Sequence, residues 1–225
     1  MGFDMNAFSL AGKKAIVTGG AKKTGLCYGM AVALHDAGAE IVILDANSQV
    51  ENTVAELGGA KSGYHAVVAN LLDLNDLSNG FQQAISALGG RLDILVNGAG
   101  LQYRCPSEEF PEDAWDRIMG VNIKGVFFMS QLAGKVMLKQ GKGKIINIAS
   151  TNSFIGLRNM PAYVSSKGGV KQLTMALQGR DRQPDPDPLG GGQAVRHQCQ
   201  RHCSRLHGHR NEQGSAADGT GQTAH

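Results

Sequence analysis

Aromatic residues, prolines and cysteines are scarce in this chain of 225 residues, and it has no long apolar run. Aromatic side chains make up 5% of the sequence, with 6 prolines and 4 cysteines. No stretch of about 18 apolar residues occurs, which excludes a membrane-spanning helix. The first residues also lack the basic-then-apolar pattern of a signal peptide. No two cysteines form a C-x-x-C pair, which favours a reducing compartment over a disulfide framework. We therefore expect a cytoplasmic protein with no membrane partner.

Glycine is abundant instead, with 31 residues, about twice the usual share. The net charge of +3 is small and its basic residues are dispersed, so no nucleic-acid partner is indicated. Over residues 1–177, short β-branched runs alternate with amphipathic stretches, as in a parallel sheet with flanking helices. The expected strands are 15–17, 40–44, 65–68, 92–96 and 145–148, and the expected helices are 25–37, 48–57, 76–88, 113–140 and 163–177. The predicted fold class is α/β, a doubly wound parallel sheet of the Rossmann type.

The character of the chain changes after Leu177. Large apolar residues become rare, and residues 185–192 combine alternating Asp and Pro with a run of glycines, which is typical of a linker. We expect a nucleotide-binding catalytic domain over 1–177 and a disordered tail over 178–225, because the tail has too few apolar residues to fold. A zinc site could be read into the tail from His197, Cys199, His202 and Cys203, followed by His207 and His209. Without an apolar scaffold a flexible basic arm is favoured, and no metal is expected.

A glycine-rich turn lies between the first predicted strand and the first helix, with the candidate residues Thr18, Gly19, Lys23, Thr24 and Gly25. In that context, backbone N–H groups and the positive end of the helix form a cradle for a pyrophosphate. Asp45 ends the second strand, where a carboxylate can accept hydrogen bonds from an adenosine ribose. A solvated turn with a helix-capping Asp is the alternative. The charge of Asp45 would repel a 2′-phosphate, whereas Lys22 or Lys23 could pair with one, so we expect NAD, with NADP less favoured.

A Ser, a Tyr and a Lys near the end of the predicted sheet indicate proton chemistry. Tyr163 and Lys167 lie one helical turn apart and share a helix face. A nearby ammonium lowers the pKa of a phenol, which a base acting on an alcohol requires. Ser150 ends the fifth strand, where its hydroxyl could bind the substrate oxygen. An exposed helix pair is the alternative for Tyr163 and Lys167, and the neighbouring dinucleotide turn argues against it.

These motifs together resemble the short-chain dehydrogenase/reductase family, in order over about residues 8–177: the glycine-rich turn, Asn97-Gly98-Ala99-Gly100, Asn122, Ser150, and Tyr163 with Lys167. The resemblance implies hydride transfer between a nicotinamide and a carbonyl or alcohol carbon. It implies that Tyr163 is the general acid/base, and that Lys167 lowers its pKa and holds the nicotinamide ribose. It further implies that Ser150 orients the reacting oxygen and that Asn122 holds a water in a proton relay.

The resemblance also extends the cofactor site and shows two departures. It implies that Asn97, Gly98, Ala99 and Gly100 support the fourth strand beside the cofactor, and that Asn70, next to Leu71, accepts from the adenine amine. Lys23 stands where the family usually has its middle glycine, and Gly98 replaces a second asparagine. Both changes are expected to weaken cofactor binding without removing a chemical group.

The loop after the fourth strand suggests the substrate class. Its sequence resembles family members that oxidise sugar acids and polyols in carbohydrate metabolism, and Arg104 offers a rigid fork suited to a carboxylate. Arg104, Ser150 and Tyr163 are therefore the candidate substrate residues. A surface or subunit-contact role for Arg104 is the alternative. The resemblance also implies a homotetramer.

The family implies a sixth strand after the Tyr–Lys helix, and residues 178–225 show none. One back-translation of residues 197–212, shifted by one base, gives INVNAIAPGYMATEM, which resembles that strand and its turn. We therefore expect the chain to leave the family reading frame between Leu177 and His197, with the C-terminal strands missing. A non-catalytic nucleotide-binding or self-associating protein is the alternative function.

Overall fold

The computed structural model describes residues 8–177 of the chain. The predictions for the tail, its disorder, its zinc ligands and its reading frame, fall outside these residues. Within the described part, no helix has both the length and the apolar character needed to cross a bilayer.

A parallel sheet in the strand order β3-β2-β1-β4-β5 forms the centre of the domain. The strands are β1 (Lys14–Thr18), β2 (Glu40–Asp45), β3 (Tyr64–Val68), β4 (Ile94–Asn97) and β5 (Lys144–Asn147). All neighbouring pairs run parallel, and β1 and β4 are adjacent although they are distant in sequence. The order therefore reverses between β1 and β4, which confirms the doubly wound prediction.

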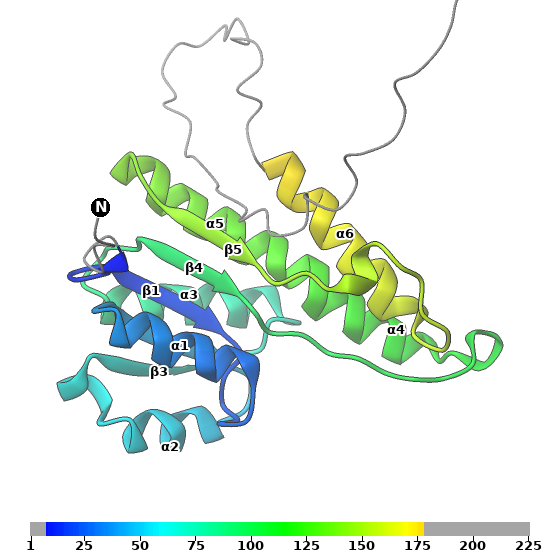
Figure 1. Ribbon diagram of the computed structural model, residues 1–225, viewed down its shortest axis with the longest axis horizontal. Coiled ribbons are helices and arrows are strands. Elements are labelled where there is room, and N and C mark those ends of the chain that lie inside the picture. Colours follow the sequence, from blue (N-terminus) through cyan, green and yellow to red (C-terminus); the bar gives the residue numbers. More distant parts are fainter. Residues whose placement is uncertain (1–7, 178–225) are drawn as a thin grey trace, which may run out of the picture.

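Helices cover both faces of the sheet. The helices of the described part are α1 (Leu26–Asp36), α2 (Gln49–Glu56), α3 (Leu74–Ala87), α4 (Glu112–Met119), α5 (Val126–Gln140) and α6 (Pro161–Leu177). One buried cluster joins the sheet to α3 and α5, around Phe81, Leu95 and Met129. The other joins it to α1 and α2, around Ala31, Ile43 and Val50. Figure 1 shows α1 in front of the sheet and α3 behind it.

The central strands β1, β2 and β4 are buried on both faces because they contribute to both clusters. In β2, Val42 and Leu44 belong to one cluster, whereas Ile41 and Ile43 belong to the other. A strand buried on both sides has no polar positions to alternate, which explains the continuous apolar runs of the sequence.

The predicted long helix over 113–140 is wrong at its centre. The structure divides it into α4, a π-helical segment Gly120–Gly125, and α5. A π-helical turn inserts one residue into the helical repeat, and such turns are frequent at functional sites. Here the turn contains Asn122, which is completely buried.

Candidate active site

A crevice of about 550 Å³ lies at the carboxyl end of the sheet. Its lining comes from the turn after β1, the end of β2, the turn after β3 and the loop after β4, with two residues from the α4 region. The lining residues are Gly19, Gly20, Ala21, Lys22, Gly25, Leu26, Cys27, Leu44, Asp45, Ala46, Asn47, Ala69, Asn70, Leu71, Leu72, Gly98, Ala99, Gly100, Leu101, Arg117 and Val121. Ligands of doubly wound sheets bind at this edge, where the strand order reverses.

The glycine-rich turn forms one wall of the crevice with its backbone. Gly19 has a φ of +80°, and a Cβ there would lie 3.2 Å from the Cα of Ala99. Gly25 is the N-cap of α1 and provides no side-chain cap, so no side chain satisfies the first N–H groups of the helix. A positively polarised helix end beside glycine backbone fits the pyrophosphate of a dinucleotide.

Asp45 is held at the crevice by backbone hydrogen bonds. Its Oδ2 accepts from the N–H of Ala21 at 2.9 Å, and its Oδ1 accepts from the N–H of Asn47 at 3.0 Å. Each carboxylate oxygen keeps a lone pair for a further donor. The carboxylate is thus fixed in a position where ribose hydroxyls could donate to it.

The two lysines of the turn differ in position. Lys22 lines the crevice. The ammonium of Lys23 pairs with the carboxylate of Glu56 on α2, and Lys23 is not among the lining residues. The exposed Thr24 is not among them either. Of the two lysines considered for a 2′-phosphate, the structure therefore brings Lys22 to the site.

Two predicted cofactor residues, Thr18 and Asn97, are buried and support the crevice without lining it. The Oγ1 of Thr18 accepts from the N–H groups of Gly98 and Ala99, at 3.0 and 3.2 Å. The side-chain amide of Asn97 donates to the Oγ of Ser130 at 2.9 Å and to the Oδ1 of Asn147 at 2.8 Å. Thr18 therefore fixes the loop after β4 against β1, and Asn97 ties β4 to β5 and α5.

Cys27 explains the departure at Gly98. A Cβ on Gly98 would lie 2.5 Å from the Sγ of Cys27, closer than two such atoms can approach. The thiol therefore occupies space that a side chain at position 98 would need. Burial raises the pKa of Cys27, and the nearby charge of Asp45 raises it further.

Gly98→Asn is expected to destabilise the chain by about 1–3 kcal/mol, because the new side chain overpacks against Cys27. In the Cys27→Ala background the same change should cost less by at least about 1 kcal/mol. Urea unfolding of the two single variants and the double variant measures this coupling. Equal costs in both backgrounds would contradict the steric explanation.

Tyr163 and Lys167 lie on α6, and Ser150 lies in the loop after β5, which contacts α6. The Nζ of Lys167 lies 5.9 Å from the ring centroid of Tyr163, and it donates to the carbonyl of Ile148 at 2.7 Å. Lys167 is only 4% exposed, and this burial lowers its pKa. The Oγ of Ser150 accepts from the N–H of Asn152 at 3.2 Å.

Ser153 connects Ser150 to α6, a role that the sequence analysis missed. Its Oγ accepts from the N–H of Ser150 at 3.2 Å and donates to the carbonyl of Lys167 at 2.8 Å. The two serines form a capping box on the short 3₁₀ helix Thr151–Ser153. The spacing of Ser150 and Ser153 is that of a capping box, but Ser153 stands where the usual sequence signal has Glu or Gln.

Asn122 fastens the loop after β4 to α6. Its Oδ1 accepts from the N–H of Leu101 at 2.7 Å, and its Nδ2 donates to the carbonyl of Leu101 at 2.9 Å. The Nδ2 also donates to the Oγ of Ser166 at 3.0 Å, and this hydroxyl donates to the carbonyl of Tyr163 at 2.8 Å. The side chain therefore holds the crevice wall in position relative to Tyr163.

Arg104 lies apart from the crevice lining, on the exposed part of the loop after β4. Figure 1 shows this loop and the loop after β5 extending beyond the carboxyl end of the sheet. They are joined where the N–H of Cys105 donates to the carbonyl of Asn159 at 3.0 Å. A second cation that the sequence did not reveal, Arg117 on α4, lines the crevice itself.

Comparison with known proteins identifies relatives of the described domain. The family model for short chain dehydrogenases matches residues 13–183. The 2-dehydro-3-deoxy-D-gluconate 5-dehydrogenase of Escherichia coli K12 is 43% identical over 174 residues, which cover 77% of this chain and 67% of the relative. The D-threitol dehydrogenase of Mycolicibacterium smegmatis is 36% identical over 171 residues, covering 76% of this chain and 65% of the relative.

A solved structure shares the fold as well. The gluconate 5-dehydrogenase of Burkholderia cenocepacia, in complex with NADP and tartrate, matches with a TM-score of 0.70 and 32% identity, covering 76% of this chain and 67% of that one. Because this relative holds NADP, the expectation that NADP is less favoured than NAD is not supported.

Proposed function

This chain belongs to the short-chain dehydrogenase family, and on that premise we propose that it transfers a hydride between a nicotinamide dinucleotide and a secondary alcohol or ketone of a sugar acid or polyol. One observation carries the proposal: the buried ammonium of Lys167 lies one helical turn from Tyr163, and its Nζ would lie 3.7 Å from a Cβ on Gly100, which lines the crevice, although neither Tyr163 nor Lys167 is itself among the lining residues. The relatives named for sugar acids and for a polyol support the substrate class.

The residues divide the chemistry between them. A bound nicotinamide dinucleotide supplies or accepts the hydride. Tyr163 accepts the hydroxyl proton when an alcohol is oxidised and returns it when a ketone is reduced. The ammonium of Lys167, which lies 5.9 Å from the ring centroid of Tyr163, would hold the nicotinamide ribose. Ser150 orients the reacting oxygen by a hydrogen bond, and Asn122 keeps the crevice wall aligned with α6.

A turnover assay tests the proposal. The purified chain is incubated with NAD or NADP and a panel of sugar acids and polyols, and the absorbance of the reduced nicotinamide is followed. Turnover with a panel member supports the enzyme. Dinucleotide binding without turnover on any member overturns it and supports the alternative, a nucleotide-binding protein without catalysis. The homotetramer, predicted from the family resemblance, is checked by light scattering on the same sample.

Asp45 is expected to set the preference between the two dinucleotides. Its carboxylate is fixed at the crevice, where the hydroxyls of the adenosine ribose of NAD could donate to it. The 2′-phosphate that NADP carries on this ribose would be repelled by the carboxylate. Asp45→Asn should raise the ratio of kcat/KM for NADP to kcat/KM for NAD about tenfold, equivalent to about 1.4 kcal/mol. Glu51→Gln on α2 removes an equal charge outside the crevice lining and should leave the ratio unchanged. An unchanged ratio in Asp45→Asn would contradict this role.

Arg104 is proposed to bind the carboxylate of an acidic substrate. Arg104→Ala should raise KM about tenfold or more for a sugar acid and leave KM for a neutral polyol nearly unchanged, because only the acid loses a charged partner. Steady-state kinetics on both substrates measure the difference. Equal changes for acid and polyol would show that Arg104 acts on the loop rather than on the carboxylate.

A further inference from the structure

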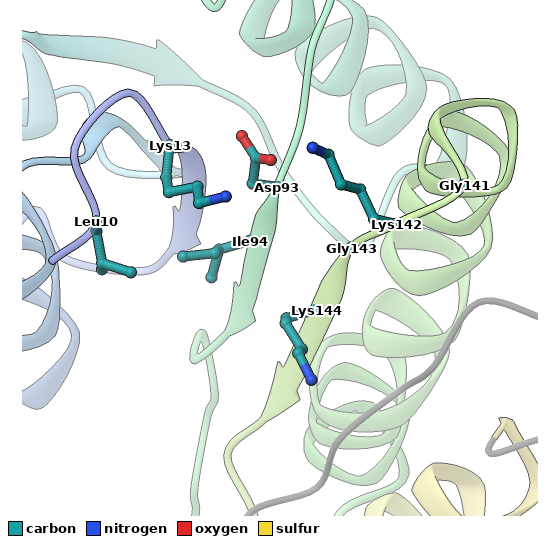
Figure 2. Close-up of a pocket in the computed structure, with 8 residues that line it drawn as sticks. All are labelled: Leu10, Lys13, Asp93, Ile94, Gly141, Lys142, Gly143 and Lys144. Atoms are coloured by element: carbon teal, nitrogen blue, oxygen red, sulfur yellow. The ribbon is translucent and has the colours of Figure 1, made fainter. Parts of the chain in front are cut away.

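A second cavity, of about 440 Å³, lies at the opposite end of the sheet from the crevice. It is lined where β1, β4 and β5 begin, whereas the crevice lies where β1 to β4 end. Figure 2 shows its lining residues, which include three lysines and one carboxylate. Nothing in the proposed dehydrogenase chemistry uses this end of the sheet.

The carboxylate of the cavity, Asp93, is already engaged. Its Oδ1 accepts from the guanidinium of Arg91 at 2.8 Å, and its Oδ2 accepts from the backbone N–H of Lys14 at 3.0 Å. Asp93 is 6% exposed, and these bonds satisfy its buried carboxylate. Because the guanidinium of Arg91 already neutralises the carboxylate, Asp93 contributes little to neutralising the lysines of the cavity.

Two of the lysines, Lys13 and Lys142, form no ion pair with any carboxylate of the described residues. Lys13 precedes β1 and is half-buried, whereas Lys142 follows α5 and is exposed. In Figure 2 both side chains extend toward the region of Asp93 from opposite sides. The ammonium groups of Lys13 and Lys142 therefore bring positive charge to the cavity that no carboxylate of the described residues neutralises in an ion pair.

The turn after α5 presents Lys142 to the cavity. Gly141 has a φ of +70°, a conformation that favours glycine, and a Cβ on Gly143 would lie 2.2 Å from the Cγ of Met137. Since both neighbours lack side chains, Lys142 is the single side chain of this turn on the cavity wall. Lys142 also follows the C-terminal end of α5, whose partial negative charge attracts an ammonium. Lys13 precedes β1 and does not follow a helix end, so the helix dipole does not explain its position.

We propose that this cavity binds a small polyanion carrying phosphate or carboxylate groups, held between the ammonium groups of Lys13 and Lys142. An anion with two charged groups can contact lysines on both walls, and the walls contributed by Leu10 and Ile94 keep water from part of it. The site is separate from the crevice, so the proposal does not depend on the dehydrogenase function.

Isothermal titration of the full chain with pyrophosphate and with citrate, each in low salt, tests the proposal. The two probes distinguish a phosphate-bearing from a carboxylate-bearing ligand. We expect one-to-one binding of at least one probe, about tenfold weaker in the Lys13→Gln/Lys142→Gln double variant, because the charge contacts of one half-buried and one exposed ammonium are lost. The Lys61→Gln/Lys135→Gln double variant makes the same charge change on exposed lysines outside both cavities, and it should bind as the unaltered chain does.

Three outcomes would overturn the site: no binding of either probe, equal weakening in the two double variants, or binding that is lost on addition of dinucleotide and unaffected by Lys13→Gln/Lys142→Gln. The last result would place pyrophosphate in the crevice. If a variant does not fold, lysine acylation of the unaltered chain, followed by mass spectrometry, tests the same site. The bound probe should slow the acylation of Lys13 and Lys142 and leave the acylation of Lys61 unchanged. An equal effect of the probe on all three lysines would contradict the proposal.

Discussion

Tyr163→Phe is expected to lower kcat about 10³-fold and to leave dinucleotide binding within about twofold of the unaltered chain. The proposed function assigns the proton exchange with the substrate oxygen to this phenol, and losing a general acid/base typically costs about 10²–10⁴-fold. A loss of 10³-fold corresponds to about 4 kcal/mol of transition-state stabilisation. The backbone of α6 stays in place, because the hydrogen bond from Ser166 goes to the carbonyl of Tyr163 rather than to its side chain.

Steady-state rates and dinucleotide titration on the same preparation separate the two effects. Tyr28→Phe, on α1, makes the identical atomic change outside the crevice lining and should retain full turnover. If Tyr163→Phe keeps a tenth or more of the turnover, another group moves the proton and the assignment is wrong. If turnover and dinucleotide binding fall together, the residue serves binding rather than proton transfer.

The fold was predictable from the sequence because its signals are local. The central strands of the parallel sheet, β1, β2 and β4, are buried on both faces, which makes each a continuous apolar run such as Ile41 to Leu44. The helices carry local boundary signals as well: Gly38, with a φ of +105°, follows the end of α1, and the side chain of Asp73 accepts from the first N–H groups of α3. Strand and helix boundaries were consequently expected within a few residues of where they lie.

The π-helical turn was not predictable in the same way. A single inserted residue between α4 and α5 changes the helical period over one turn only, and the apolar positions on either side still fit an uninterrupted helix. The turn is stabilised by contacts distant in sequence, since Asn122 bonds to Leu101 and Ser166. The family resemblance predicts that Asn122 holds a water in a proton relay, and this stays a prediction. The structure adds the hydrogen bonds by which Asn122 holds Leu101 in the crevice wall.

The candidate site was predictable as a set of residue types but not as a set of contacts. Gly98 stood out as a departure from the family pattern, yet only the fold shows that the Cys27 thiol fills the space beside it. From the sequence, either Lys22 or Lys23 could pair with a 2′-phosphate, and the ion pair of Lys23 with Glu56 distinguishes them. Both cases depend on residues that approach each other through tertiary packing, which no local pattern encodes.

Lys167→Met is expected to lower kcat/KM about 10³-fold and to remove a pH dependence of stability. The ammonium of Lys167 is buried, and burial holds its pKa below the ordinary value of 10.5. As the pH rises, the folded chain therefore loses this proton before the unfolded chain does. Between the folded pKa and 10.5 the unfolded state binds more protons, so the contribution of this group to the unfolding free energy increases with pH. Below that window the full cost of burying the charge is present.

Urea unfolding at several alkaline pH values, compared between the unaltered chain and Lys167→Met, isolates this contribution. The difference in unfolding free energy should shift in favour of the unaltered chain as the pH passes through the window, because only that chain carries the group. Lys124→Met, an exposed lysine of the π-helical turn, is the matched control and should show the slope of the unaltered chain. A parallel pH dependence in Lys167→Met would mean that this ammonium is not the titrating group. Turnover retained in that variant would mean that the phenol of Tyr163 works without a neighbouring charge, which would remove the observation on which the proposed function depends.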